Sequence, residues 1–523
     1  MTFETTSRTG LLAAEALGEA PAAERLAALR DRPILLAIDA ARAATRAGQL
    51  ALATAASLVG RLFDYAPAID VAAPPAPVLP RVAGLVAGRP LATEVVGLLQ
   101  SLPPEPGRYQ YRVAPGGVRY PVALVIGEAP VTADAVVHAD GHGWYARVGP
   151  TPAPSDPVDT DGGFNPFGPL AAAALGAAEV AKHVFRTLGR PVAFPVLRRP
   201  VAWDLWTHAF DAPPTGPPLP GALELGRFAV AGLGAVGAAA VWALADLGDA
   251  RGTVELIDDD RLEATNLERV LTARGADVGL LKVRAAARAL AGTRLRALTF
   301  AARYGIAPPS GASATTILCG LDSGAGRRRL QALLPRALYN GGTQGGELLV
   351  SRHVGLEGPC LECLYPETDD PVGRTAARLG VDRATADALV RGERRLDAAV
   401  LEAMRRRGGI RLDGMSAEAL LGAPLATLEA AVCSRAIVIE DLPEATISFT
   451  SALAGFLAAA ELVKDRVGGV RRRGPLDVAR PVLRLDMLGG LPGPDCVEAY
   501  VPRRDCVCQE TETRRSFARA RRR

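Results

Sequence analysis

The stretch that most constrains the fold runs from Arg227 to Lys282 and spaces three glycines as Gly232-x-Gly234-x-x-Gly237. An apolar strand precedes the glycines, an Ala-rich helix follows them, and a second strand ends at Asp258. This order is typical of a doubly wound sheet, in which the glycines let the backbone approach a phosphate and the helix N-terminus faces it. We therefore predict an α/β fold: a Rossmann-like domain of mostly parallel strands with helices on both faces.

Polar residues in and beyond this stretch favour ATP over a dinucleotide. Asp258 lies 21 residues after Gly237, where an acid that binds ribose is expected. Arg269 and Lys282 suit the β- and γ-phosphates of a triphosphate. A further apolar strand, TTILCGLD, ends at Asp322, whose carboxylate suits magnesium. A glycine fingerprint alone most often indicates NAD or FAD, but a dinucleotide site has no role for Lys282 or Asp322.

The same positions closely resemble the adenylation domain of ubiquitin-activating enzymes and of the sulfur-carrier adenylyltransferases of the molybdopterin and thiamin pathways. The resemblance covers residues 221–350 and resumes at 436–508. The matching residues are Gly232, Gly234, Gly237, Asp258, Asp260, Asn266, Arg269, Lys282, Asp322 and Arg327. This chain departs from the family in Asp259, a third acid beside Asp258, and in Ser323, where the family usually has Asn.

The resemblance also implies roles for the matching residues. Asp258 is expected to bind the ribose, and Asp322 is expected to bind Mg²⁺. Asn266, Arg269 and Lys282 are expected to bind the phosphates of ATP. The Gly232–Gly237 turn and Asp260 complete the nucleotide site that we predict.

Four of the seven cysteines form two close pairs, Cys360-x-x-Cys363 and Cys506-x-Cys508. Two such pairs can close a tetrahedral four-thiolate zinc site, which is structural because no coordination position stays open. The activating-enzyme family often has such a site between these regions, although its second pair is usually Cys-x-x-Cys. Two alternatives stay open: the thiols are buried and reduced, or Cys496 replaces one of the ligands.

Residues 364–432 are Arg-rich and helical in pattern, and we expect them to form a crossover insertion. Their length and position resemble the insertion that carries the thioester cysteine in activating enzymes. By this resemblance Cys433 attacks the acyl adenylate and holds the acyl group as a thioester. The alternative is that Cys433 is a small buried apolar side chain, which is what we expect of Cys319 in its core strand.

The N-terminal half contains an echo of the C-terminal half. An Ala-rich apolar helix ends in Glu179-x-x-Lys182 and another ends in Glu461-x-x-Lys464. The first half has no glycine fingerprint, no Asn-x-x-Arg and no matching Lys. We therefore predict a degenerate, inactive adenylation domain that buries the partner face of the active one, with Arg198 or Arg199 reaching across the interface. An unrelated domain is the alternative.

These patterns divide the chain into six parts. We predict an N-terminal helical segment (1–75), an inactive adenylation-like domain (76–215), the first part of the active domain (221–360), the insertion (364–432), the last part of the active domain with the second cysteine pair (433–510), and a basic tail (511–523).

Composition excludes other classes of protein. A formal net charge of +4 over 523 residues predicts no broad nucleic-acid-binding surface. Phe228 to Ala245 is 18 residues without a charge, but it contains the phosphate-loop glycines, so we interpret it as buried sheet and helix and not as a membrane span. No apolar run follows Met1 closely, so we predict no signal peptide and a cytoplasmic location.

The predicted activity is ATP- and Mg²⁺-dependent adenylation of the C-terminal carboxylate of a ubiquitin-like protein, followed by a thioester on Cys433 and transfer to a conjugating enzyme. The two-lobed chain resembles the bacterial activating enzymes of antiviral ubiquitin-like conjugation systems, as a pseudo-dimer within one chain or as a homodimer. The alternatives are a sulfur-carrier adenylyltransferase, a peptide-tailoring adenylating enzyme and, more distantly, a NAD-dependent oxidoreductase or a non-catalytic scaffold.

Overall fold

A computed structural model describes most of the chain. The described residues are 23–105, 107–152, 163–188, 194–304, 308–366, 371–407, 410–412, 416–428, 437–439, 446–468, 476–491 and 496–520. They belong to two units, one of Met1–Tyr365 with Ala445–Arg523 and the other of Pro366–Glu444. None of the described helices has the length and apolarity needed to cross a lipid bilayer.

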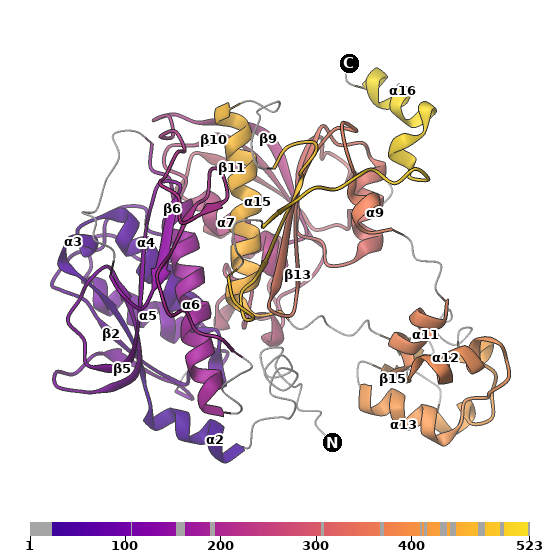
Figure 1. The fold of residues 1–523 in the computed structure, drawn as a ribbon, viewed down its shortest axis with the longest axis horizontal. Coiled ribbons are helices and arrows are strands. Elements are labelled where there is room, and N and C mark those ends of the chain that lie inside the picture. Colours follow the sequence, from indigo (N-terminus) through magenta and orange to yellow (C-terminus); the bar gives the residue numbers. More distant parts are fainter. Residues whose placement is uncertain are drawn as a thin grey trace. The chain divides into compact units, whose positions relative to one another are not determined.

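The first lobe of the larger unit is built on an eight-stranded sheet with the order β3-β2-β1-β4-β5-β6-β7-β8 (Figure 1). Its strands are β1 (Ile34–Ile38), β2 (Ala68–Ala72), β3 (Gln110–Val113), β4 (Tyr120–Ile126), β5 (Ala133–His142), β6 (Tyr145–Gly149), β7 (Val201–Asp204) and β8 (Ala209–Phe210). Its helices are α2 (Ala23–Ala28), α3 (Ala40–Ala43), α4 (Arg46–Gly60), α5 (Leu91–Ser101) and α6 (Phe167–Leu188). Along the sheet, the neighbours β3, β2, β1, β4 and β5 pair in parallel. The neighbours β5, β6, β7 and β8 pair antiparallel.

The second lobe repeats this plan in the order β11-β10-β9-β12-β13-β14-β17-β18. Its strands are β9 (Glu224–Ala231), β10 (Arg251–Ile257), β11 (Leu295–Phe300), β12 (Thr316–Cys319), β13 (Ala337–Gln344), β14 (Glu347–Val354), β17 (Val482–Asp486) and β18 (Val497–Glu498). Its helices are α7 (Ala235–Ala245), α8 (Lys282–Ala289), α9 (Gly324–Ala332), α10 (Leu361–Leu364), α15 (Ser448–Gly468) and α16 (Thr511–Ala520). The parallel and antiparallel pairs occur in the same sequence as in the first lobe.

The predicted α/β fold class is therefore confirmed, with one α/β domain preceding the domain that carries the glycine turn. One part of the first lobe differs from expectation, because residues 1–75 were predicted to be helical and they contain β1 and β2 as well as α4. The β1 run ILLAI is buried at every position. A parallel strand buried on both faces shows no alternation, so its sequence cannot be told from a piece of apolar helix.

The long helices α6 and α15 join the two lobes. They pack against each other, and α15 also packs on α7, which Figure 1 shows at the centre of the larger unit. One hydrophobic core runs through both lobes along these helices. The sequence echo occupies equivalent places on them: Lys182 Nζ lies 2.5 Å from Glu179 Oε1, and Lys464 Nζ lies 2.5 Å from Glu461 Oε1. All four side chains are buried, so each charge is compensated within its own helix.

The smaller unit, Pro366–Glu444, overlaps the insertion predicted for residues 364–432. It contains α11 (Pro371–Leu379), α12 (Arg383–Val390) and α13 (Ala398–Arg407), with a short antiparallel pair, β15 (Ile410–Leu412) and β16 (Ile437–Ile439). Its own small core includes Leu379, Leu389 and Met404.

Candidate active site

The predicted nucleotide residues meet at the carboxyl edge of three neighbouring strands. In the sheet register, Ala231 of β9 pairs with Ile257 of β10 and with Cys319 of β12. Gly232, Asp258 and Gly320 follow these three residues directly. The carboxyl edge of an open α/β sheet is where ligands bind, so the glycine turn and the ribose acid lie where a nucleotide is expected.

The turn around Gly232 requires glycine at two positions. Gly232 has a φ of +84°, and a Cβ there would lie 2.9 Å from the carbonyl carbon of Gly320. A Cβ on Gly237 would lie 1.9 Å from the oxygen of Gly232. Gly234 differs, because no heavy atom lies within 4 Å of its Cβ position. It is the N-cap of α7, so there is open space beside the start of that helix, as a phosphate site requires.

Backbone groups hold Asp258 at the mouth of this turn. Its carboxylate accepts hydrogen bonds from the Leu233 N–H at 2.6 Å and from the Asp260 N–H at 2.9 Å. Burial raises the pKa of Asp258, and the nearby Lys282 ammonium opposes that rise. The carboxylate is therefore fixed beside the glycine loop, in the position from which a ribose hydroxyl would be recognised.

Lys282 begins α8 and pairs with Asp260 across the loop that follows β10. Its Nζ lies 2.7 Å from Asp260 Oδ2, and its backbone N–H donates to the Asp260 carbonyl at 3.0 Å. An isolated antiparallel β-bridge between Arg261 and Leu281 joins the two ends of this loop. Lys282 is thus brought back to the carboxyl edge of β10, next to Asp258.

Asn266 and Arg269 lie within the same loop, in a helical turn that begins with the 3-10 segment Ala264–Asn266. Asn266 Oδ1 accepts from the Glu263 N–H at 3.2 Å. The Arg269 guanidinium donates to the Thr265 carbonyl at 2.6 Å and lies 3.3 Å from Glu268. Both Asn266 and Arg269 are buried, so the position of their polar groups depends on the conformation of the loop.

Asp322 lies three residues beyond β12 and is exposed. A free carboxylate at this edge is an oxygen donor of the kind Mg²⁺ prefers, so Asp322 fits the metal role. At Ser323, where Asn was expected, the hydroxyl accepts from the Gly326 N–H at 3.1 Å and caps α9. Arg327 on α9 is buried, with its guanidinium 4.4 Å from the centroid of the Tyr365 ring.

The equivalent edge of the first lobe is filled. Asp39 follows β1, and a Cβ on Gly127, which follows β4, would lie 1.9 Å from Asp39 Oδ2. Arg42 lies 2.7 Å from Asp140 and 3.6 Å from Asp39. Two carboxylates and one guanidinium occupy the place that the glycine turn leaves open in the second lobe, and their net negative charge disfavours a phosphate.

The interface arginines proposed from sequence position do not lie between the lobes. Arg199 is exposed and pairs with Asp211 of the same lobe at 2.6 Å, and Arg198 is also exposed. The arginines that do reach from the first lobe into the second include Arg46, Arg61 and Arg81. Their sequence context, Ala-rich helix and Pro-rich loop, gave no signal of this role.

The four paired cysteines converge. The Sγ of Cys360 lies 3.4 Å from that of Cys506 and 4.0 Å from that of Cys363, and the Cys363 and Cys508 sulfurs are 3.6 Å apart. Tetrahedral zinc with bonds of about 2.3 Å places its sulfurs roughly 3.8 Å apart. All four are buried and have the thiol chemistry that zinc prefers, so the donor set fits a structural zinc ion. Cys496 is buried elsewhere and donates to the His208 carbonyl at 3.4 Å.

The proposed thioester residue, Cys433, lies outside the described residues. Cys319 is buried in β12, as expected, and burial raises the pKa of its thiol, which makes it a poor nucleophile.

His353 is a buried neighbour of the cysteine cluster. Its Nδ1 lies 2.6 Å from the Pro359 oxygen, and its Nε2 lies 2.9 Å from Ser351 Oγ. Burial lowers the pKa of His353 to about 4, so the imidazole is neutral at pH 7.

We predict a pH-dependent contribution of His353 to stability. Its folded pKa is below the unfolded value of about 6.5, so the unfolded chain binds the proton first as pH falls. The stabilisation is complete above pH ~6.5 and is lost between pH ~6.5 and ~4, up to about 3 kcal/mol. Urea unfolding of the wild type and of His353→Gln across this range should give a difference in unfolding free energy that shrinks as pH falls; a constant difference would contradict it.

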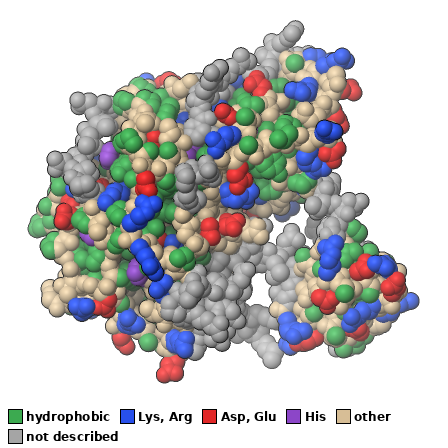
Figure 2. Space-filling view, in the orientation of Figure 1, with side chains coloured by type: hydrophobic (Ala, Val, Ile, Leu, Met, Phe, Trp, Pro, Cys, Tyr) green, Lys and Arg blue, Asp and Glu red, His purple; other side chains and the backbone are tan. Residues whose placement is uncertain are grey.

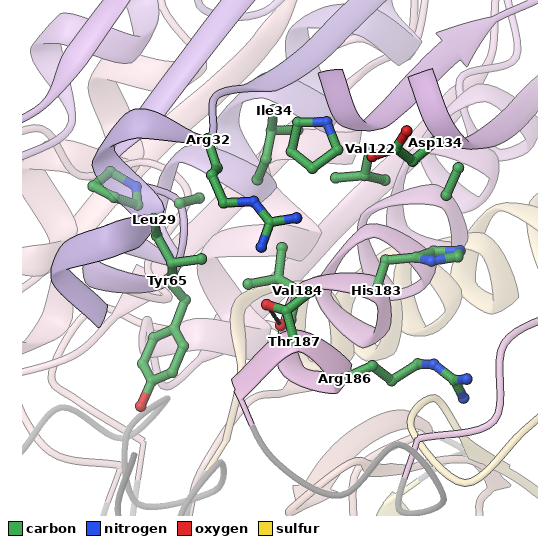
Figure 3. A pocket seen from close by; sticks show the side chains of 14 residues that line it. Leu29, Arg32, Ile34, Tyr65, Val122, Asp134, His183, Val184, Arg186 and Thr187 are labelled. Atoms are coloured by element: carbon green, nitrogen blue, oxygen red, sulfur yellow. Dashed lines mark hydrogen bonds between the residues drawn. The ribbon is translucent and has the colours of Figure 1, made fainter. Parts of the chain in front are cut away.

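A cavity of about 320 Å³ lies at the amino-terminal ends of the strands of the first sheet (Figure 3). Its lining includes Ile34 and Val122 at the amino ends of β1 and β4, with His183 and Thr187 of α6. The cavity lies in the first lobe and is therefore separate from the nucleotide residues, which lie at the carboxyl edge of the second sheet. On the face seen in Figure 2, basic and acidic side chains are intermixed over the described surface, in keeping with the small net charge.

Both lobes of the chain match known protein families. A family model described as the ThiF family matches residues 214–488, and one described as the BilD N-terminal domain matches residues 33–205. An uncharacterized protein, y4jF of Sinorhizobium fredii, is 27% identical over 464 residues, which cover 84% of this chain and 83% of that protein.

Solved structures of E. coli MccB are more distant. The complex with selenomethionine MccA is 14% identical, with a TM-score of 0.34 over 54% of this chain and 66% of that chain. The complex of the microcin C7 biosynthetic enzyme MccB with N-formylated MccA is 15% identical, with a TM-score of 0.34 over 54% and 67%. The chain thus spans about two thirds of the length of these proteins.

Proposed function

Because the chain belongs to the ThiF family of adenylating enzymes, we propose that it activates the C-terminal carboxylate of a ubiquitin-like protein with ATP and passes the acyl group to a thiol. One observation carries the proposal: the open N-terminus of α7, Asp258 and the loop with Asp322 lie together at the carboxyl edge of β10, β9 and β12. The match of the first lobe to the BilD N-terminal domain, known from bacterial antiviral ubiquitin-like conjugation, supports a ubiquitin-like substrate.

In the proposed first step, a carboxylate oxygen attacks the α-phosphorus, a new C(=O)O–P bond forms, and the bond to the β-phosphate oxygen breaks. The carboxylate is already ionised near neutral pH, so no general base is required. Arg269 and Lys282 neutralise the departing pyrophosphate, and Asp258 orients the ribose. A magnesium ion held by Asp322 supplies further charge neutralisation when it is bound.

In the proposed second step, the Cys433 thiolate attacks the acyl carbon and AMP leaves with the electron pair of the broken acyl–oxygen bond. The resulting thioester is then transferred to the thiol of a conjugating enzyme. A sulfur-carrier adenylyltransferase would share the first step and would not need the insertion of 366–444.

Cys433→Ala is expected to leave adenylation, measured as pyrophosphate release, within about twofold of wild type and to remove the thiol-sensitive adduct with the carboxylate protein. Cys433→Ser is expected to convert that adduct into an oxygen ester that resists reducing agents. The readouts are non-reducing gels with and without thiol, and pyrophosphate release. An adduct that persists in Cys433→Ala would assign the thioester to another residue, and pyrophosphate release without any adduct in the wild type would favour the sulfur-carrier alternative.

A further inference from the structure

The loop that carries Asn266 and Arg269 rests on the first lobe. Its apolar residues Leu267, Val270 and Ala273 form a small buried cluster, and the first-lobe residue Phe63 packs against it. Gly275 also lies against the first lobe, because a Cβ there would be 2.0 Å from the Pro103 oxygen. The phosphate-binding part of the candidate site is therefore shaped by a surface outside its own domain.

The main polar contact at this surface is Arg61, the residue that caps the C-terminus of α4. Its guanidinium donates to three carbonyl oxygens of the loop: that of Leu267, that of Leu271 at 3.0 Å and that of Ala273 at 2.8 Å. Its Nε lies 3.4 Å from Ser57 Oγ. The residue is fully buried, and Asp277, the acid whose charge acts on it, pairs with Arg288 at 2.5 Å. Three of the four hydrogen bonds that Arg61 makes among the described residues therefore go to the loop.

We infer that Arg61 is a positioning residue for the ATP site of the other lobe, because it fixes the turn from which Asn266 and Arg269 reach the phosphates. This inference rests on the proposed adenylation. A buried carbonyl without a donor is costly, and Arg61 satisfies three of them within residues 267–273 of the loop. Burial lowers the pKa of Arg61 to about 9, so its side chain is still protonated at neutral pH.

The backbone beside Arg61 supports the inference. Phe63 has a φ of +45°, a conformation that is unfavourable for a bulky side chain. Such strain persists where surrounding packing determines the conformation, and here Phe63 faces both the loop cluster and Tyr109. The segment from Arg61 to Phe63 is therefore adapted to the loop.

An equivalent contact runs from the second lobe to the first. Asp246 caps the C-terminus of α7, the helix equivalent to α4, and is fully buried. Its carboxylate accepts from the Ala83 N–H at 3.3 Å in the first lobe. Each lobe thus uses the residue after its first long helix to hold the loop after the second strand of the other lobe. Only the contact made by Arg61 supports a loop with phosphate-binding residues.

The test compares Arg61→Met with Arg46→Met in the full-length chain. Arg46 is also an α4 arginine that reaches the second lobe, where it donates to the Asp246 carbonyl at 3.0 Å and pairs with the Asp246 carboxylate at 3.4 Å, and none of its hydrogen bonds among the described residues goes to the loop. Calorimetry gives the dissociation constants of Mg-ATP and of AMP, and hydrogen exchange gives the protection of residues 262–273. For Arg61→Met we expect Mg-ATP to bind about 10-fold or more weakly, AMP to bind nearly as before, and the loop amides to exchange faster.

Arg46→Met should change none of these three readouts, and methylguanidinium should restore Mg-ATP binding to Arg61→Ala. Wild-type affinity and loop protection in Arg61→Met would overturn the inference, as would equal weakening of ATP and AMP, which indicates a general loss of structure. If the wild type itself binds no Mg-ATP, the proposed function fails, and the inference that depends on it fails with it. If the wild type binds Mg-ATP and Arg61→Met binds it with the same affinity, only the inference is refuted.

Discussion

Asp322→Ala is expected to reduce adenylate formation by a factor of about 10² to 10³. Asp322 is exposed beyond β12 at the edge where Asp258 and the glycine turn lie, and it is the proposed oxygen ligand of Mg²⁺. Without it the charge on the departing pyrophosphate is less well neutralised, while contacts to adenine and ribose remain. Pyrophosphate release in the presence of the carboxylate protein measures the rate, and Mg²⁺ titration of ATP affinity measures the metal contribution.

Asp259→Ala is the matched control for this loss. Asp259 is an exposed acid of the same edge, but it pairs with Arg303 at 2.9 Å and has no role in the proposed chemistry. We expect its pyrophosphate release to stay within about twofold of wild type. Full activity in Asp322→Ala, or an equal loss in Asp259→Ala, would remove the assigned role from Asp322.

Removal of the proposed zinc ion is expected to have the largest effect on stability. The four sulfurs lie 3.4–4.0 Å apart in the measured pairs and join the turn at Cys360 to the C-terminal tail at Cys508. In small zinc-binding domains the metal contributes roughly 10–16 kcal/mol, which is also folding free energy. Cys360→Ser should therefore lose zinc and unfold the segment 496–520 locally, as measured by metal analysis and by limited proteolysis of that segment.

Cys319→Ser is the control, because Cys319 is also a buried thiol of the second lobe but lies outside the cluster. It should keep one zinc ion per chain and an intact tail. A wild type purified without zinc, and insensitive to chelators, would show that the four cysteines are reduced thiols.

The sequence was most informative where a single residue type is required. The glycine spacing and the acids that follow each strand predicted the edge at which Gly232 and Asp258 meet, because only glycine fits that turn and only strand ends face the ligand. The two cysteine pairs also predicted that their four sulfurs lie together, since two close pairs of cysteines are typical of a zinc site. The repeat was visible in the Glu-x-x-Lys motifs of α6 and α15, although most of the first lobe has no motif.

The remaining features had no sequence signal. β1 and β2 were missed because strands buried on both faces resemble apolar helix. The role of Arg61 was missed because its partners are backbone carbonyls more than 200 positions away, and every residue has a carbonyl. The closure of the first-lobe site by Asp39, Arg42 and Asp140 likewise depends on distant residues that only the fold brings together.

The most direct test of the account is the thermal unfolding of the purified chain with Mg-ATP and, separately, with NAD. A ligand at about 100 times its dissociation constant stabilises the native state by roughly 2.7 kcal/mol. We predict that Mg-ATP raises the melting temperature, that NAD does not, and that the Mg²⁺-dependent part of the rise is lost in Asp322→Ala. Stabilisation by NAD alone would contradict the account and would assign the Gly232–Gly237 turn to a dinucleotide.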